Sequence, residues 1–97
     1  MASRDRLDDQ AITQALSALD GWQRDGDQIV REFEFRDFVE AFGFLARVAI
    51  LQEKANHHAE TWGVYNKVRL TLSTHDAGGI TQKDVDLARE VDVLLRQ

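Results

Sequence analysis

The ten residues VYNKVRLTLS, numbers 64–73, carry the clearest structural signal in the chain. Their even-numbered side chains are mostly apolar and their odd-numbered ones mostly polar: Val64, Asn66, Val68, Leu70 and Leu72 against Tyr65, Lys67, Arg69, Thr71 and Ser73. Successive side chains of a strand point to opposite faces of its sheet. The alternation therefore predicts a strand of an antiparallel sheet that has one covered face and one solvated face.

Before this strand, the sequence predicts a helix and a hairpin. Apolar side chains recur at helical spacing across residues 8–19, and Gly21 is a typical C-terminal stop. Asp25-Gly26-Asp27 is a turn signal. We therefore expect residues 22–24 and the alternating residues 28–35 to be the two strands of the hairpin.

Two more helices complete the pattern. Asp37 is a suitable N-cap for a helix that runs to about Ala55, and Thr81 with Asp84 resembles the capping box of a last helix. Between the last strand and this helix, the DAGG segment (76–79) predicts a turn. The order is helix, strand, strand, helix, strand, helix, which predicts an α+β fold with helices on one face of a single antiparallel sheet.

Length and composition limit the class of protein. A chain of 97 residues suits a single domain over residues 1–97, and a domain this small gains from burying more surface in an oligomer. The net charge of −5 argues against direct nucleic-acid binding, and the lack of cysteine excludes disulfides and thiolate metal sites. The charged start MASRDRLDDQ lacks the apolar region of a signal peptide, and no apolar run approaches the ~20 residues of a membrane span. A cytoplasmic location is expected.

All three histidines lie around the predicted strand, with His57 and His58 before it and His75 after it. Imidazole exchanges protons near neutral pH, so the three residues suit acid–base catalysis, a metal site or a plain surface role. A metal is the least favoured, because no HxxxH pair or accompanying carboxylate pattern is present. His75 has the odd parity of the solvated face, which predicts that it projects away from the helices.

Two carboxylates near the histidines each have two interpretations. Asp84 is suited to the first turn of a helix, where the helix dipole stabilises a negative charge. It is also suited to orienting an imidazole. Glu53 lies four residues before His57 and would share its helix face if the helix continued, whereas an exposed glutamate is the simpler interpretation.

The chain resembles the pterin-4a-carbinolamine dehydratase family, whose vertebrate members double as dimerisation cofactors of a homeodomain transcription factor. The resemblance covers about residues 15–95, including FRDFVEAFGFLARVA (35–49) and VYNKVRLTLSTHDAGGIT (64–81). The matching motif residues are Glu53, His57, His58, Trp62 or Tyr65, His75 and Asp84. Two departures stand out. Ala59 follows the histidine pair where the family usually has proline or another small residue, and Thr61 occupies the usual tryptophan position, with Trp62 one residue later.

The resemblance implies a hydro-lyase that converts a 4a-hydroxytetrahydropterin into quinonoid dihydropterin and water, in tetrahydrobiopterin recycling, without a metal or organic cofactor. It implies catalytic roles for His57, His58 and His75. The implied pterin contacts are Asn56, Ser73, Thr74, Asp76 and Trp62, and the residues implied to orient an imidazole are Glu53 and Asp84.

The resemblance also implies a homodimer or homotetramer. No membrane partner is expected, because no apolar run is long enough to span a bilayer. The apolar stripe of the predicted helix 37–55 is wide enough to meet a second subunit, and we expect charged residues at Phe44 or Leu51 to weaken that contact. The alternative is a non-catalytic dimerisation or coactivator module on the same fold. Ala59 and the displaced tryptophan keep this alternative open.

Overall fold

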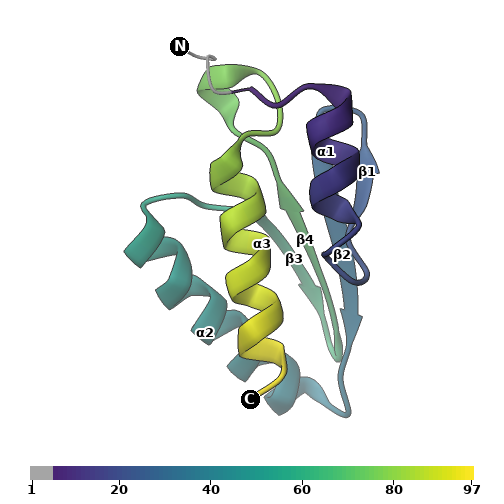
Figure 1. The fold of residues 1–97 in the computed structure, drawn as a ribbon. Coiled ribbons are helices and arrows are strands. Elements are labelled where there is room, and N and C mark those ends of the chain that lie inside the picture. The colour runs from purple at the N-terminus through teal and green to yellow at the C-terminus, as the bar shows by residue number, and fades with distance from the viewer. Residues whose placement is uncertain (1–5) are drawn as a thin grey trace.

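The computed structural model describes residues 6–97 and contains a four-stranded antiparallel sheet with helices on one face (Figure 1). This confirms the predicted fold class. The elements in chain order are α1 (Asp9–Leu16), β1 (Gln23–Asp25), β2 (Gln28–Glu34), α2 (Phe38–Ala55), β3 (Glu60–Val64), β4 (Lys67–Leu72), a 3₁₀ turn (His75–Ala77) and α3 (Gln82–Leu95). Within residues 6–97, no helix has both the length and the apolar character needed to cross a membrane. A single domain over residues 1–97 stays a prediction.

The sheet has the order β1-β2-β4-β3, and every neighbouring pair is antiparallel. Its covered face carries the even-numbered side chains of β4, as the alternation predicted. The core consists of side chains from this face and from the helices, including Ile29, Phe33, Val68, Leu70 and Leu72 from the strands and Phe44, Val48, Val85, Ala88 and Val91 from α2 and α3. No helix formed by residues 6–97 lies on the opposite face of the sheet (Figure 1).

The structure adds one strand to the predicted order, because residues 60–64 form β3 at the edge of the sheet. All five β3 residues are exposed, so their sequence lacks the alternation that reveals a half-buried strand. The start of the predicted strand 64–73 was also wrong. Val64 ends β3, and Tyr65 with Asn66 makes the turn into β4, with Tyr65 in the left-handed conformation at φ 52°.

The helix caps follow the prediction closely. Asp37 accepts a hydrogen bond from the Glu40 N–H at 2.9 Å, and α2 ends at Ala55 as expected. Thr81 opens α3 with the predicted capping box. The helix α1 is shorter than predicted, because it ends at Leu16 and not near residue 19. Leu19 is still buried in the turn that follows.

A buried polar network joins the start of the sheet to α3. Trp22 Nε1 and Arg31 Nη1 each donate to Asp92 Oδ1 at 2.9 Å. Gly21 precedes this network at φ 83°, and a Cβ added there would lie 2.7 Å from Arg31 Nε. The positive φ favours glycine at this position, and a Cβ there would force the Arg31 guanidinium to shift.

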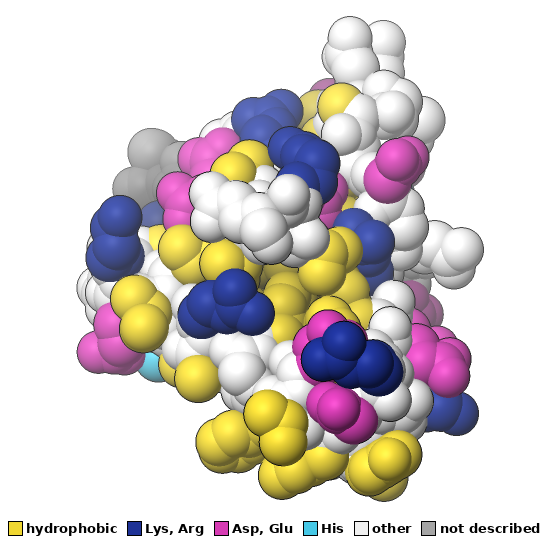
Figure 2. All heavy atoms as spheres, turned by 90° about the horizontal axis from the view of Figure 1, so that it is seen from below, with side chains coloured by type: hydrophobic (Ala, Val, Ile, Leu, Met, Phe, Trp, Pro, Cys, Tyr) yellow, Lys and Arg dark blue, Asp and Glu magenta, His cyan; other side chains and the backbone are white. Residues whose placement is uncertain are grey.

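The apolar stripe of α2 divides into a buried part and an exposed part. Phe44 is buried and packs on Phe33 and Phe35 with ring centroids 4.9 Å away, so the prediction that it contacts a second subunit was wrong. The large exposed apolar side chains of α2 are instead Phe38, Val39, Phe42 and Ile50. Figure 2 shows hydrophobic side chains gathered along one margin of the molecule when it is viewed from below.

Candidate active site

A buried carboxylate at the start of α3 holds His57. The His57 Nε2 lies 2.6 Å from Asp84 Oδ1, while Asp84 Oδ2 accepts hydrogen bonds from the Thr74 hydroxyl and the Thr81 N–H at 2.9 Å each. Asp84 is fully buried and the His57 side chain is 11% exposed. A carboxylate in its ionised form only accepts hydrogen bonds, so beside that form Nε2 is the donor nitrogen and Nδ1 is the ring nitrogen not engaged by Asp84. Asp84 thus fits both interpretations made from the sequence, because it caps α3 and contacts an imidazole.

The second imidazole of the pair points elsewhere. His58 Nε2 lies 2.8 Å from Glu53 Oε2, and both side chains are more than half exposed. The simpler interpretation of Glu53 as an exposed glutamate is confirmed, because its side chain is 77% exposed. Glu53 does not share a helix face with His57, since α2 ends at Ala55 and Asn56 adopts the left-handed conformation at φ 52°. Because the His58 side chain is 56% exposed, its imidazole is accessible to a ligand.

His75 lies in the 3₁₀ turn rather than on the strand. β4 ends at Leu72, so strand parity does not set the direction of this side chain, although His75 is exposed as predicted. It lines a hollow of about 380 Å³. The other residues around this hollow are Ser73, Thr74, Gly78 and Gly79 on the same segment and Asp25, Asp27 and Gln28 at the β1–β2 turn.

The β1–β2 turn was not predicted to belong to the site. The sequence indicated only a turn at Asp25-Gly26-Asp27, and the pairing of β2 with β4 decides where this turn lies. Ile29 is opposite Leu72, so the preceding Gln28 falls beside Ser73. An antiparallel pairing of the two predicted strands would have revealed this proximity, because it brings the start of one strand to the end of the other.

Thr74 connects the His75 segment to His57. Its hydroxyl donates to Asp84 Oδ2 and lies 2.7 Å from the Thr81 hydroxyl. The carboxylate that holds His57 therefore also holds the residue next to His75. Both histidine segments converge on the first turn of α3.

The remaining predicted site residues lie further from this convergence or at the surface. Trp62 is on β3 opposite Arg69, whose guanidinium lies 5.0 Å from the indole centroid, so the indole sits on the helix-free face of the sheet. Asn56 is the C-cap of α2 and Asp76 lies in the 3₁₀ turn, and both are exposed. Their contacts with a pterin stay predictions.

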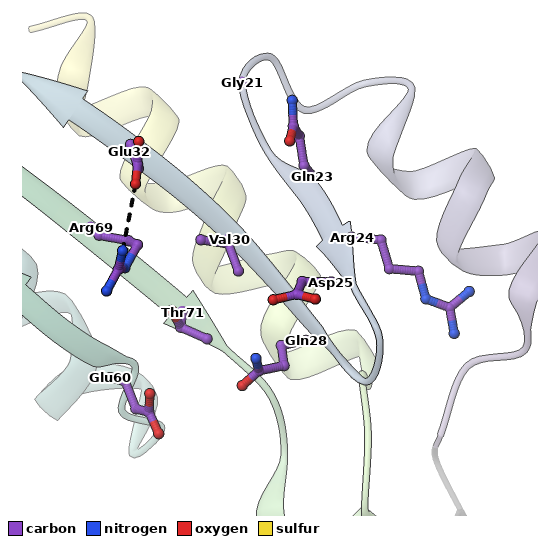
Figure 3. A pocket seen from close by; sticks show the side chains of 10 residues that line it. All are labelled: Gly21, Gln23, Arg24, Asp25, Gln28, Val30, Glu32, Glu60, Arg69 and Thr71. Atoms are coloured by element: carbon purple, nitrogen blue, oxygen red, sulfur yellow. Dashed lines mark ion pairs between the residues drawn. The ribbon is translucent and has the colours of Figure 1, made fainter.

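The helix-free face of the sheet carries a second, larger hollow of about 730 Å³. Figure 3 shows most of its lining side chains in front of the sheet, whereas Arg24 extends towards α1, where it pairs with Asp9. Glu32 and Arg69 pair across this face at 3.6 Å. Asp25 and Gln28 line both hollows, so the two adjoin at the β1–β2 turn. A ligand in the His75 hollow is therefore bordered by a polar surface.

The structure offers no evident metal site in the part of the chain it describes. Among residues 6–97, no group of three or more histidine, cysteine, aspartate or glutamate side chains is placed to hold a metal ion.

Comparison with known proteins agrees with the geometry. The family described as pterin 4 alpha carbinolamine dehydratase matches residues 5–94. A relative from Nitrobacter winogradskyi, provisionally named as such a dehydratase, is 47% identical over 96% of this chain and 94% of its own length. A similarly named relative from Brucella ovis is 45% identical over 95% of this chain and 97% of its own.

Two solved structures are also similar. The crystal structure of a transcriptional coactivator/pterin dehydratase from Brucella melitensis has a TM-score of 0.89 and 43% identity, and it covers 92% of this chain and 97% of its own. A pterin dehydratase-like RuBisCO assembly factor of the alpha-carboxysome shares the fold, at a TM-score of 0.59 and 24% identity over 75% of this chain and 84% of its own. With a family match over nearly the whole chain and close relatives of full length, this protein belongs to the pterin 4 alpha carbinolamine dehydratase family.

Proposed function

We propose that the protein dehydrates a 4a-hydroxytetrahydropterin to quinonoid dihydropterin by histidine acid–base catalysis. The observation that carries the proposal is the 2.6 Å contact between His57 Nε2 and the fully buried Asp84. A buried carboxylate is costly unless several donors satisfy it, and capping α3 requires no imidazole. A fixed imidazole with one free nitrogen is suited to moving a proton at a bound ligand.

The chemistry requires two proton movements. The C4a–O bond breaks with its electron pair on oxygen, the hydroxyl takes up a proton and leaves as water, and a ring N–H loses a proton. Substrate therefore becomes product plus water, with no oxidant or other reactant. Each proton transfer by a positioned side chain contributes typically ~10²–10⁴-fold in rate.

We assign the leaving hydroxyl to His57 and His75, acting on opposite faces of the ring, and substrate binding to His58. The hollow beside His75 is supportive, because about 380 Å³ lies within the ~300–1,000 Å³ range of small-molecule sites. Ser73 and Thr74 contribute hydrogen-bonding groups to it. Asn56, Asp76 and Trp62 complete the proposed pterin contacts.

The test is turnover of a 4a-hydroxytetrahydropterin by the purified protein and by a His75→Ala variant. We expect the variant to lose about 10²-fold or more in kcat at an unchanged melting temperature, because His75 is exposed. Turnover equal to that of the parent would remove His75 from the mechanism. Absence of turnover in the parent protein would reject the dehydratase assignment.

We also propose that the protein forms a homodimer or homotetramer through the exposed apolar side chains of α2. Large apolar side chains in one exposed patch are typical of interaction surfaces. A place in tetrahydrobiopterin recycling and a cytoplasmic location remain predictions of the sequence.

The second candidate is a non-catalytic dimerisation or coactivator module. The relative from Brucella melitensis is described as both a coactivator and a dehydratase, which makes this alternative specific. The same turnover assay separates the two, because a non-catalytic module would associate normally and leave the pterin unchanged.

A further inference from the structure

Gln52 is a polar residue at a core position of α2. The buried residues of this helix are Ala41, Phe44, Val48 and Gln52, which follow one another at spacings that keep them on a single face. Gln52 is only 6% exposed. An apolar side chain would suit this position better, because burying an amide costs free energy unless the amide is hydrogen-bonded.

The Gln52 residue holds the histidine loop at two points. Its side-chain oxygen Oε1 accepts a hydrogen bond from the Ala59 N–H at 2.8 Å, and its main-chain carbonyl accepts one from the His57 N–H at 3.1 Å. These two bonds lie on either side of the His57-His58 pair. Residues 57–59 have no helix or strand of their own, so they depend on such bonds for a defined path.

We propose that Gln52 is a positioning residue for the histidine pair, an inference that rests on the proposed dehydratase function. Its amide holds the chain immediately after His58, and so it limits the positions open to both imidazoles. The His57 ring meets Asp84 at 2.6 Å, and the proposed mechanism requires its other nitrogen to reach the ligand at the same time. These two demands leave little tolerance for movement of the loop. A misplacement of about 1 Å at a catalytic group can cost ~10²-fold in rate.

The experiment uses a double-mutant cycle of Gln52→Met and Ala59→Pro. Methionine has a similar length and favours helix, but it cannot accept the Ala59 N–H bond. Proline has no N–H, so Ala59→Pro removes the donor that Gln52→Met leaves unpaired. The proline ring also restricts the loop without help from Gln52. We expect Gln52→Met to lower kcat about 10- to 100-fold, and the double variant to recover most of that loss. Gln82→Met, at an exposed position of α3, is the matched control and should keep the kcat of the parent.

Two readouts distinguish positioning from a structural role. The melting temperature should fall by only a few degrees in Gln52→Met, because the apolar side chain gained at a buried position offsets part of the cost of leaving the Ala59 N–H unpaired. The ¹⁵N signals of the His57 ring should change from one defined tautomer to an exchanging mixture, and the Ala59 amide should lose protection from hydrogen exchange. These NMR readouts need no turnover, so they test Gln52 even if the dehydratase assignment fails.

Parental kcat and parental His57 ring signals in Gln52→Met would overturn the proposal. A loss of activity that follows the loss of melting temperature, with no recovery in the double variant, would also overturn it. The second result would make Gln52 a contributor to stability only.

Discussion

Replacing Asp84 by asparagine separates the two roles of this carboxylate. The substitution keeps the shape of the side chain and exchanges one acceptor oxygen for an NH₂ donor. The position of Oδ2 accepts from both Thr74 and Thr81, so the remaining carbonyl of asparagine is best placed there. The NH₂ group then faces His57 Nε2, which must present a lone pair instead of a proton. The His57 ring is forced into the opposite tautomer, and its protonated form loses its only anionic partner among the described contacts.

The expected loss of activity is much larger than the expected loss of stability. Removing acid–base function from one imidazole costs ~10²–10⁴-fold in rate, and a 10³-fold loss corresponds to about 4 kcal/mol of activation free energy. Hydrogen bonds to a charged group exceed neutral ones by about 1 kcal/mol each, but the desolvation cost of the buried charge disappears as well. We therefore expect the free energy of unfolding to fall by only about 1–2 kcal/mol. For a domain of this size, each kcal/mol lowers the melting temperature by about 4–8 °C.

The assay compares kcat and urea unfolding for Asp84→Asn and for Asp92→Asn. Asp92 is the matched control, since it is also buried on α3 and is held by two side chains, Trp22 and Arg31, as Asp84 is held by His57 and Thr74. The control should lose stability and keep the kcat of the parent. Equal kcat values for Asp84→Asn and the parent would refute the role of the carboxylate in orienting His57. Equal losses of kcat in both variants would show that the effect is general destabilisation.

Three further outcomes are expected. Gly21→Ala should lower the free energy of unfolding in urea by about 1–3 kcal/mol, and by more than Gly26→Ala does, because only Gly21 faces the Arg31 guanidinium. Equal losses in the two variants would contradict this contact. Phe42→Glu should shift the species seen by size-exclusion chromatography with light scattering towards monomer while the melting temperature of the monomer is kept, whereas Phe44→Glu should unfold the core. An unchanged mass for Phe42→Glu would exclude the exposed face of α2 as the oligomer interface. A chelator should leave turnover unchanged, and activity that is lost with EDTA and restored by a metal would require a different mechanism.

Patterns among neighbouring residues predicted much of the fold. The alternation around Val68 and Leu70 identified the covered face of β4, because strand side chains alternate regardless of what covers them. The caps at Asp37 and Thr81 marked the starts of α2 and α3, since a cap bonds to an N–H only two or three residues away. The edge strand β3 was missed because none of its side chains is buried, which leaves no periodicity to detect.

The sequence by itself determined which residues have the chemistry of the candidate site, namely the three histidines and Asp84. Only the tertiary structure decided how they meet. The His57–Asp84 contact spans 27 positions, the pairing of β2 with β4 brings the β1–β2 turn to His75, and Gln52 reaches Ala59 across the end of α2. Local periodicity shows which side chains share a face of an element, but the partner of that face depends on strand register and helix packing. These depend on contacts between residues far apart in the chain, and no short stretch of sequence contains both partners.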